Sequence, residues 1–167
     1  GAGSADRAIY AADLADLAIT YDSGTDTFTL TDQNTADGDE GTDTVTGIET
    51  FTLNGTDYTK SELITEAARQ ANTGPGSPSL ASGGTVAENS AAATIVATLQ
   101  ATDADGDALT YQITDAAGSP VIDPNFEIVG NEIRVKAGAD LDYEAATSHG
   151  LYITASDAFE TSSPQAV

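Results

Sequence analysis

Three carboxylates stand at alternate positions in residues 101–107, which read ATDADGD. A strand-like run, ALTYQI, follows at once at residues 108–113. Like charges this close repel one another, and a hard cation such as Ca²⁺ removes that cost because it takes about 6–8 oxygen ligands. We therefore expect the second half of the chain to be built around a calcium-binding loop that contains Asp103, Asp105 and Asp107.

The charge of the chain fits such a loop and limits the partners. The sequence has 27 acids against 5 bases, a net charge of −22, and neither half of it is basic. We expect no nucleic-acid partner, because Lys/Arg patches that bind phosphate are missing. We also expect no membrane insertion, since no run approaches the roughly 18 apolar residues of a membrane span. A chain this acidic suits an exterior rich in salt or metal ions, where counterions screen its self-repulsion.

The absence of cysteine points to the same surroundings. Without cysteine the chain has neither disulfides nor thiolate metal sites. An extracellular protein without disulfides needs another stabilising cross-link, and bound Ca²⁺ is the usual candidate. We expect an extracellular location, either secreted or at the cell surface.

A stretch rich in Gly, Pro and Ser divides the chain. Residues 73–84 read TGPGSPSLASGG, which indicates a linker and the one clear domain boundary. We expect a small β-rich domain at residues 1–72 and an all-β sandwich at residues 85–167. The expected fold class is therefore mainly β.

The first domain is expected to be β-rich and to end in a helix. Apolar residues alternate with threonines in two runs, which predicts a hairpin over residues 17–31. The Asn-Gly pair at 54–55 is a strong turn signal. Thr59 and Glu62 have the spacing of a capping box, so a helix is predicted over residues 60–72.

The second domain shows short strands separated by Gly, Asp and Pro turns, a pattern typical of a β-sandwich. Little apolar alternation remains in residues 163–167, so the last strand looks truncated. The strand candidates are residues 85–88, 93–101, 108–114, 126–129, 132–136 and 151–156.

Four short motifs occur in a fixed order along this strand pattern. They are AEN at residues 87–89, DAD at 103–105, LDYE at 141–144 and ASD at 155–157. In this order, over residues 84–167, they resemble a cadherin repeat of the kind strung along large bacterial adhesins. The resemblance implies a seven-stranded Greek-key sandwich. We expect a spacer or adhesion segment whose stiffness depends on Ca²⁺. Its expected partners are neighbouring repeats or subunits of the same protein and a cell-surface or polysaccharide target.

The resemblance also implies which acids bind calcium. The glutamates belong to the C-terminal pole of such a repeat, and the aspartates to the N-terminal pole, where they complete sites begun by the preceding repeat. The acidic linker that follows the last strand in the family is absent, so we expect the C-terminal site to be incomplete. The implied ligands are Asp103, Asp105, Asp107, Asp157, Glu88 and Glu144.

The first domain carries a second resemblance. Residues 41–57, GTDTVTGIETFTLNGTD, resemble the segment that closes calcium-binding glycine-rich repeat arrays in secreted RTX proteins. An acidic run, DGDEGTD, lies beside it at residues 37–43. It lacks the later Glu of an EF-hand loop. Asp37, Asp39 and Asp43 are therefore either ligands of a single ion or part of a solvated turn.

Catalysis finds little support in the sequence. The only histidine, His149, lies in a predicted turn without a nucleophile nearby, and neither Gly-x-Ser-x-Gly nor a P-loop occurs. A glycosidase needs a cleft with aromatic platforms, and tryptophan is missing. We expect no enzymatic activity.

These observations favour a calcium-stabilised structural or adhesion module of a large secreted or surface-attached bacterial protein. One alternative is a subunit of a filament, sheath or surface layer, assembled by strand addition and bridged by Ca²⁺. Residues 5–10 or 73–84 are the candidate donor strands. Another alternative is a carbohydrate-binding module, whose target would be a polysaccharide.

Overall fold

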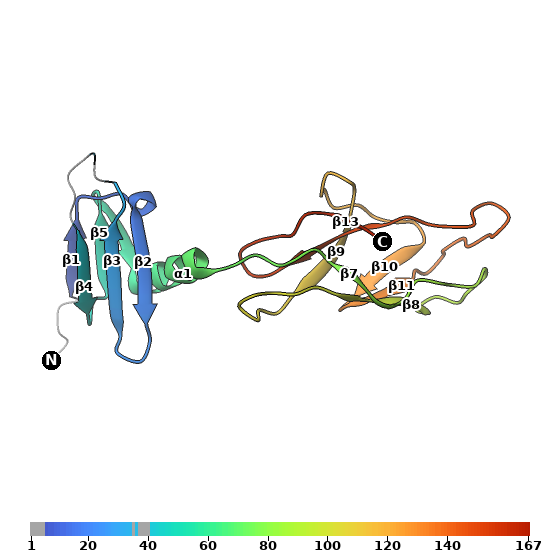
Figure 1. The fold of residues 1–167 in the computed structure, drawn as a ribbon, viewed down its shortest axis with the longest axis horizontal. Helices are drawn as coiled ribbons and strands as arrows, with labels where there is room; N and C mark the ends of the chain where they lie inside the picture. Colours follow the sequence, from blue (N-terminus) through green and yellow to red (C-terminus); the bar gives the residue numbers. More distant parts are fainter. Residues whose placement is uncertain (1–5, 35, 37–40) are drawn as a thin grey trace. The chain divides into compact units, whose positions relative to one another are not determined.

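The structure is a computed structural model, and it describes residues 6–34, 36 and 41–167. Within these residues the chain forms 13 β-strands in four sheets, one short 3₁₀-helix and one α-helix (Figure 1). This confirms the mainly β fold class predicted from the sequence. The chain divides into two compact units: unit 1 ends at Asn72, and unit 2 runs from Thr73 to Val167. No helix of the described part has the length and apolar character needed to cross a membrane.

Unit 1 contains two three-stranded sheets, in the orders β2-β3-β4 and β1-β5-β6. The first is antiparallel throughout, and the second joins β1 to β5 in parallel. The elements of unit 1 are β1 (Arg7–Tyr10), the 3₁₀-helix (Leu14–Asp16), β2 (Leu17–Asp22), β3 (Thr27–Asp32), β4 (Thr42–Thr46), β5 (Thr50–Leu53), β6 (Thr56–Thr59) and α1 (Lys60–Ala71).

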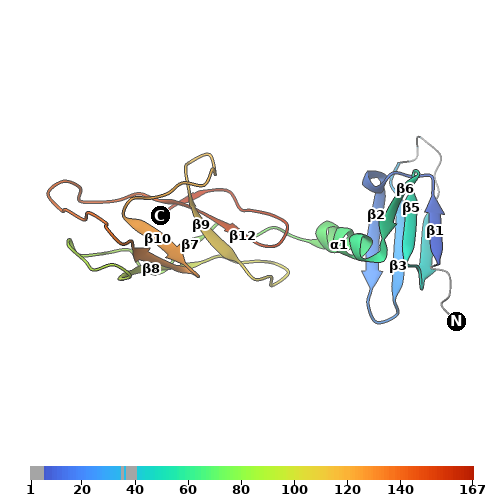
Figure 2. The same cartoon turned by 180° about the vertical axis from the view of Figure 1, so that it is seen from behind.

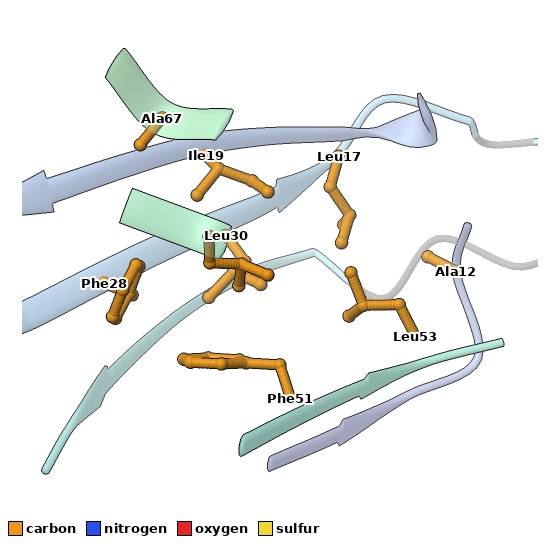
Figure 3. Packing of buried hydrophobic residues seen from close by; sticks show 9 residues of the cluster. Ala12, Leu17, Ile19, Phe28, Leu30, Phe51, Leu53 and Ala67 are labelled. Atoms are coloured by element: carbon orange, nitrogen blue, oxygen red, sulfur yellow. The ribbon is translucent and has the colours of Figure 1, made fainter. Parts of the chain in front are cut away.

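The predicted hairpin of unit 1 forms because its apolar residues alternate. Ile19 of β2 lies opposite Leu30 of β3, and both are buried. Phe51 of the other sheet meets Phe28 edge-on, with 4.8 Å between the ring centroids (Figure 3). Full burial of such side chains stabilises the fold by about 1.5–3 kcal/mol each. The core of unit 1 comprises Ala12, Leu17, Ile19, Phe28, Leu30, Phe51, Leu53, Leu63 and Ala67.

Helix α1 begins at the predicted capping box. The Thr59 hydroxyl accepts a hydrogen bond from the Glu62 backbone N–H at 3.3 Å, and the Thr59 N–H donates to the Glu62 carboxylate at 2.6 Å. These two bonds satisfy backbone donors that the first turn leaves unpaired. The helix then buries Leu63 and Ala67 against the sheets.

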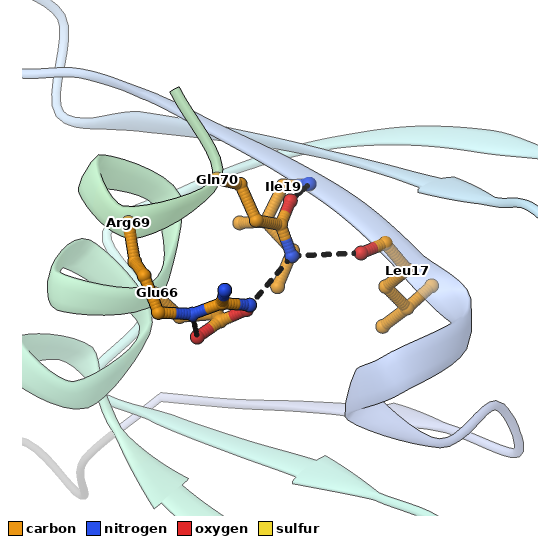
Figure 4. A network of polar contacts seen from close by, with 5 residues as sticks. All are labelled: Leu17, Ile19, Glu66, Arg69 and Gln70. Atoms are coloured by element: carbon orange, nitrogen blue, oxygen red, sulfur yellow. Dashed lines mark hydrogen bonds and ion pairs between the residues drawn. The ribbon is translucent and has the colours of Figure 1, made fainter. Parts of the chain in front are cut away.

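The last turn of α1 closes the open edge of β2 through Gln70. The Gln70 Oε1 atom accepts from the Ile19 N–H at 2.7 Å, and Nε2 donates to the Leu17 carbonyl at 3.0 Å (Figure 4). The Gln70 amide therefore bonds to β2 as a neighbouring strand would. Glu66 also accepts from Gln70 Nε2 at 3.0 Å, and the hydrogen bond from Arg69 holds the pKa of Glu66 below its usual value. Such coverage prevents an edge strand from pairing with another chain.

We predict that Gln70→Ala lowers the free energy of unfolding of unit 1 by about 1–2 kcal/mol, because two backbone groups of β2 lose their partners. Urea unfolding followed by the near-ultraviolet signal of the tyrosines measures this change. Gln33→Ala is the matched control: Gln33 is exposed and uses its backbone N–H, not its side chain, to contact Asp16. The control should change stability by less than about 0.5 kcal/mol. Equal effects of the two variants would contradict the role given to Gln70.

Unit 2 is a sandwich of a four-stranded sheet, β7-β8-β11-β10, and a three-stranded sheet, β9-β12-β13 (Figure 2). All described pairings in it are antiparallel. The seven strands match the number that the sequence implied. They are β7 (Ser79–Gly83), β8 (Ile95–Gln100), β9 (Thr110–Thr114), β10 (Phe126–Val129), β11 (Glu132–Val135), β12 (Tyr152–Ser156) and β13 (Gln165–Ala166).

The core of unit 2 lies between its two sheets and uses the inward residues of each strand. Ile153 of β12 is fully buried and lies opposite Ile113 of β9, while Leu99 of β8 faces them from the other sheet. The buried residues of this core are Ala97, Leu99, Ile113, Phe126, Ile133, Val135, Leu141, Leu151 and Ile153.

The first strand of unit 2 differs from the prediction. Strand β7 lies inside the stretch predicted as linker, and the predicted strand at residues 85–88 does not form. The reason is packing: Leu80 lies against the core, and Gly83 approaches the next strand so closely that a Cβ there would lie 2.2 Å from the Val96 carbonyl oxygen. Small residues at 79–83 therefore serve strand pairing, although their composition is typical of a linker.

Residues 84–94, which we call the strap, connect β7 to β8 without forming a strand. Left-handed backbone occurs at Gly84 (φ 99°), Asn89 (φ 56°) and Ala93 (φ 66°). These turns prevent a continuous extended run, so β8 begins at Ile95 rather than at residue 93. The last strand, β13, contains two residues and pairs with β12. The sequence predicted a truncated strand in this region.

Candidate metal sites

The loop after β8 folds around the carboxylate of Asp103. Asp103 Oδ1 accepts hydrogen bonds from the backbone N–H groups of Asp105 at 2.9 Å and of Asp107 at 3.1 Å. Gly106 supplies a left-handed residue (φ 80°) within this turn. An aspartate that accepts from the backbone two residues on is a standard turn former. Sequence spacing alone thus brings the three aspartates together.

The second oxygen of Asp103 is buried and has no hydrogen-bond partner among the described residues. One carboxylate oxygen from each of Asp103, Asp105 and Asp107 lies within 4.8 Å of the others, and we call this group the aspartate cluster. A buried carboxylate oxygen without a partner is costly, and three negative groups at this separation add repulsion. An oxygen-binding cation removes both costs, so the residues fit Ca²⁺.

The first residues of unit 2 are attached to this loop. The Thr73 N–H donates to Asp105 Oδ2 at 2.6 Å, and the Gly76 N–H donates to the Thr102 carbonyl at 2.8 Å. A Cβ at Gly74 would lie 2.3 Å from a carboxylate oxygen at the end of the exposed Glu160 side chain, so a larger residue there would displace that side chain. Residues 73–78 therefore run along the surface of unit 2 and not as a free tether.

Asp157 lies at the same end of unit 2 as the aspartate cluster but is not a member of it. Thr110 at the start of β9 pairs with Ser156 at the end of β12, so the loops before β9 and after β12 are neighbours. Asp157 Oδ1 accepts from the N–H groups of Phe159 at 2.7 Å and Glu160 at 2.6 Å. In this structure its carboxylate caps the turn after β12, and its role as a calcium ligand stays a prediction.

A second acidic group lies at the other end of β8, where the strap meets the segment after β11. Oxygens of Glu88, Asp142 and Glu144 lie within 4.8 Å of one another, and we call them the rim cluster. All three residues are exposed, and none takes part in an ion pair within the described part of the chain. The Tyr143 N–H donates to Glu88 Oε2 at 3.4 Å, which joins the strap to residues 141–144.

Asp142 is the residue of this cluster that the sequence analysis did not single out. It stands two positions before Glu144, the same alternate spacing that marks the aspartate cluster. Its Oδ1 accepts from the N–H groups of Glu144 at 3.0 Å and Ala145 at 3.3 Å, so the turn itself fixes its position. The spacing within LDYE could have identified it.

The sequence analysis also considered three aspartates of unit 1 as metal ligands and His149 as a catalytic residue. Asp37 and Asp39 lie outside the described residues. Asp43 is an exposed residue of β4 opposite Leu30 and belongs to neither acidic cluster. His149 packs edge-on against the Phe126 ring, with 5.4 Å between the centroids, so its described contact is structural.

Unit 2 is an antiparallel β-sandwich that carries two groups of carboxylates in its loops. The sequence profile of the cadherin domain matches residues 83–167, just over half of the chain. The chain therefore belongs to the cadherin domain family. Comparison with curated proteins found no match. The likeness of residues 41–57 to RTX proteins has no counterpart among these findings and stays a prediction.

Family membership defines what unit 2 is at a coarse level. Cadherin domains are structural and adhesion modules rather than enzymes. They typically bind Ca²⁺, contact neighbouring repeats and work outside the cell. Unit 2 contains two groups of three carboxylates that could hold a metal ion.

Proposed function

We propose that the chain is a calcium-stabilised structural or adhesion module of a large secreted or surface-attached bacterial protein. The observation that carries the proposal is the buried Oδ2 atom of Asp103, which has no hydrogen-bond partner in the described part of the chain, on a residue whose carboxylate lies close to those of Asp105 and Asp107. Membership of the cadherin family supports the same function. Because the chain has no cysteine, a bound metal ion and not a disulfide is the cross-link available to stabilise the short strands of unit 2.

In this proposal the aspartate cluster holds one Ca²⁺, and Asp157 adds a ligand when its loop moves toward the ion. The rim cluster holds a second ion, with Glu88 from the strap and Asp142 and Glu144 from the opposite segment. Each ion supplies positive charge that offsets carboxylate repulsion at one end of the sandwich. Because ligands from separate loops converge only in the folded state, calcium binding adds to the free energy of folding.

We predict that millimolar Ca²⁺ raises the melting temperature of unit 2 relative to EGTA. Ligand at 100 times its Kd adds about 2.7 kcal/mol of stability, and about 1 kcal/mol shifts the midpoint of a domain this size by about 4–8 °C. We therefore expect a rise of about 10 °C or more in differential scanning calorimetry. Mg²⁺ at equal ionic strength controls for screening. The same melting temperature in calcium and in chelator would contradict the proposal.

We predict that Asp103→Asn weakens calcium binding at least tenfold, because the substitution keeps the shape of the side chain but removes the charge at the centre of the cluster. Isothermal titration calorimetry measures the loss as one fewer ion or as weaker binding, and tenfold corresponds to about 1.4 kcal/mol. Asp115→Asn is the matched control. Asp115 Oδ1 accepts from the Ala117 and Ser119 N–H groups in a similar turn but belongs to neither acidic cluster. Equal losses in both variants would argue against a specific site.

A second candidate function is a polymer subunit that assembles by strand addition with bridging Ca²⁺. It is suggested by the three-stranded sheet, in which β13 pairs with β12 and is an edge strand. The donors suggested by the sequence are engaged in this structure: β1 pairs with β5, and β7 pairs with β8. Assembly would therefore require one of these strands to exchange partners. Light scattering in calcium tests the idea, and a monomer at high concentration would argue against it.

A further inference from the structure

A loop of unit 2 presents two neighbouring apolar residues to solvent. Between β9 and β10 residues 120–124 read PVIDP, and we call this segment the apolar loop. Ile122 is 88 % exposed and Val121 is 43 % exposed. Among the described residues no other large hydrophobic residue is as exposed as Ile122. Burial of these two side chains in a contact would gain the free energy that the isolated unit forgoes.

The apolar loop is held in one conformation. The Val121 N–H donates to the Ile113 carbonyl of β9 at 3.1 Å. Asp123 Oδ1 accepts hydrogen bonds from two backbone N–H groups that follow it, at 2.8 and 2.9 Å. Prolines at both ends of the loop restrict its backbone further. A contact made through Ile122 therefore orders little additional chain, which lowers its entropic cost.

A positive charge lies beside the apolar loop. Lys136 Nζ donates to the Asp123 carbonyl at 3.2 Å. Unit 2 has two basic residues, and the other, Arg134, pairs with Glu132. Lys136 takes part in no ion pair within the described part of the chain. The loop thus combines an apolar tip with a cation that is available for a carboxylate.

Unit 2 also contains an apolar cavity of about 300 Å³ that carries the opposite charge. Its lining includes buried core residues such as Ala97 and Ile133 and exposed residues such as Ala146, so the cavity opens to solvent. Glu88 and Asp142 of the rim cluster belong to the same lining. An apolar cavity of about 150 Å³ holds a benzene-sized group. The cavity of unit 2 therefore has room for two aliphatic side chains.

We propose that this cavity receives the apolar loop of a second copy of the chain, so that unit 2 binds itself. Val121 and Ile122 of one copy enter the cavity of the other, and Lys136 meets the carboxylates of the rim cluster. The loop does not fill the cavity of its own unit, since Ile122 is exposed. Apolar surface on one copy and a complementary pocket on another are the elements of such a contact, and opposite charges favour it.

This contact goes beyond the proposed function, because it gives the module a partner and does not depend on calcium. Three carboxylates outweigh the two positive charges of one Ca²⁺, so the rim cluster attracts Lys136 whether or not it holds an ion. Every copy carries both the loop and the cavity. The contact therefore forms a closed pair when it is reciprocal and a longer row of copies when it is not.

Sedimentation equilibrium of the whole chain in millimolar Ca²⁺, at up to about 1 mM protein, tests the proposal. We expect the average mass to rise with concentration and Ile122→Ser to raise the Kd of self-association at least tenfold, because it removes the apolar anchor. Ile95→Ser is the matched control: Ile95 is 54 % exposed and belongs neither to the loop nor to the cavity lining. It should change the Kd less than twofold. A monomer at every concentration, or self-association that Ile122→Ser leaves unchanged, as strand addition would be, overturns the proposal.

The absence of cysteine allows a direct test of which surfaces meet. A chain with Ile122→Cys is mixed with an isotopically labelled chain with Ala146→Cys, and mass spectrometry follows the mixed disulfide under mild oxidation. Ala145→Cys is the control, because Ala145 is exposed beside Ala146 but does not line the cavity. We expect the mixed disulfide to form at least tenfold faster with Ala146→Cys than with Ala145→Cys. Equal rates would overturn the proposal.

Titration calorimetry with Ca²⁺ on the unsubstituted chain separates this proposal from the proposed function. Calcium binding without self-association refutes the contact alone. Self-association through Ile122 without calcium binding refutes the calcium function alone and leaves the contact in place.

Discussion

Repulsion between carboxylates at the ends of unit 2 is the constraint on which its structure depends. The strands of the sandwich contain two to six residues each, so much of the unit consists of the loops that join them. Both acidic clusters lie in those loops, at opposite ends of β8. The loops can converge only if the charge is offset, and a chain with 27 acids and 5 bases has few cations of its own to do so. Under the proposed function, calcium acts on the part of the sandwich that the strands do not fix.

The exposed sheet edge of unit 1 and the acidic loops of unit 2 differ in the groups that stabilise them. Unit 1 closes the β2 edge with a neutral side chain, Gln70, whose amide copies the donor and acceptor of a peptide group. Both bonds join neutral groups and involve no ion. In unit 2 the carboxylates of the two clusters form no ion pair among the described residues, so under the proposed function dissolved cations offset their charge. Under the proposed function, the stability of unit 2 follows the calcium concentration of its surroundings, whereas the Gln70 contact of unit 1 involves no ion.

The features that sequence predicted well are those fixed by local chemistry. Alternation of apolar residues determined the β2–β3 hairpin, the Thr59 capping box determined the start of α1, and the D-x-D spacing determined the aspartate cluster. The misses depend on contacts between distant residues. Strand β7 exists because Gly83 fits against Val96, which no linker-like composition reveals. The register of β9 and β12 places Asp157 at the same end of unit 2 as the aspartate cluster. Its carboxylate, however, accepts hydrogen bonds from the backbone of its own turn. Sequence spacing cannot indicate that a turn rather than a metal ion engages this carboxylate.

The Gln70 contact has a consequence for how unit 1 opens. Its bonds to Leu17 and Ile19 belong at once to the last turn of a helix and to the edge of a sheet. Helix ends normally fray with little cost, while sheet edges exchange their amide protons slowly only when a neighbour covers them. Fraying of the last turn of α1 would withdraw the Gln70 side chain from β2. We therefore expect the Ile19 amide proton to exchange with solvent when the end of the helix opens. The helix terminus and the strand edge therefore form one cooperative unit of local unfolding, although they are about fifty residues apart in sequence.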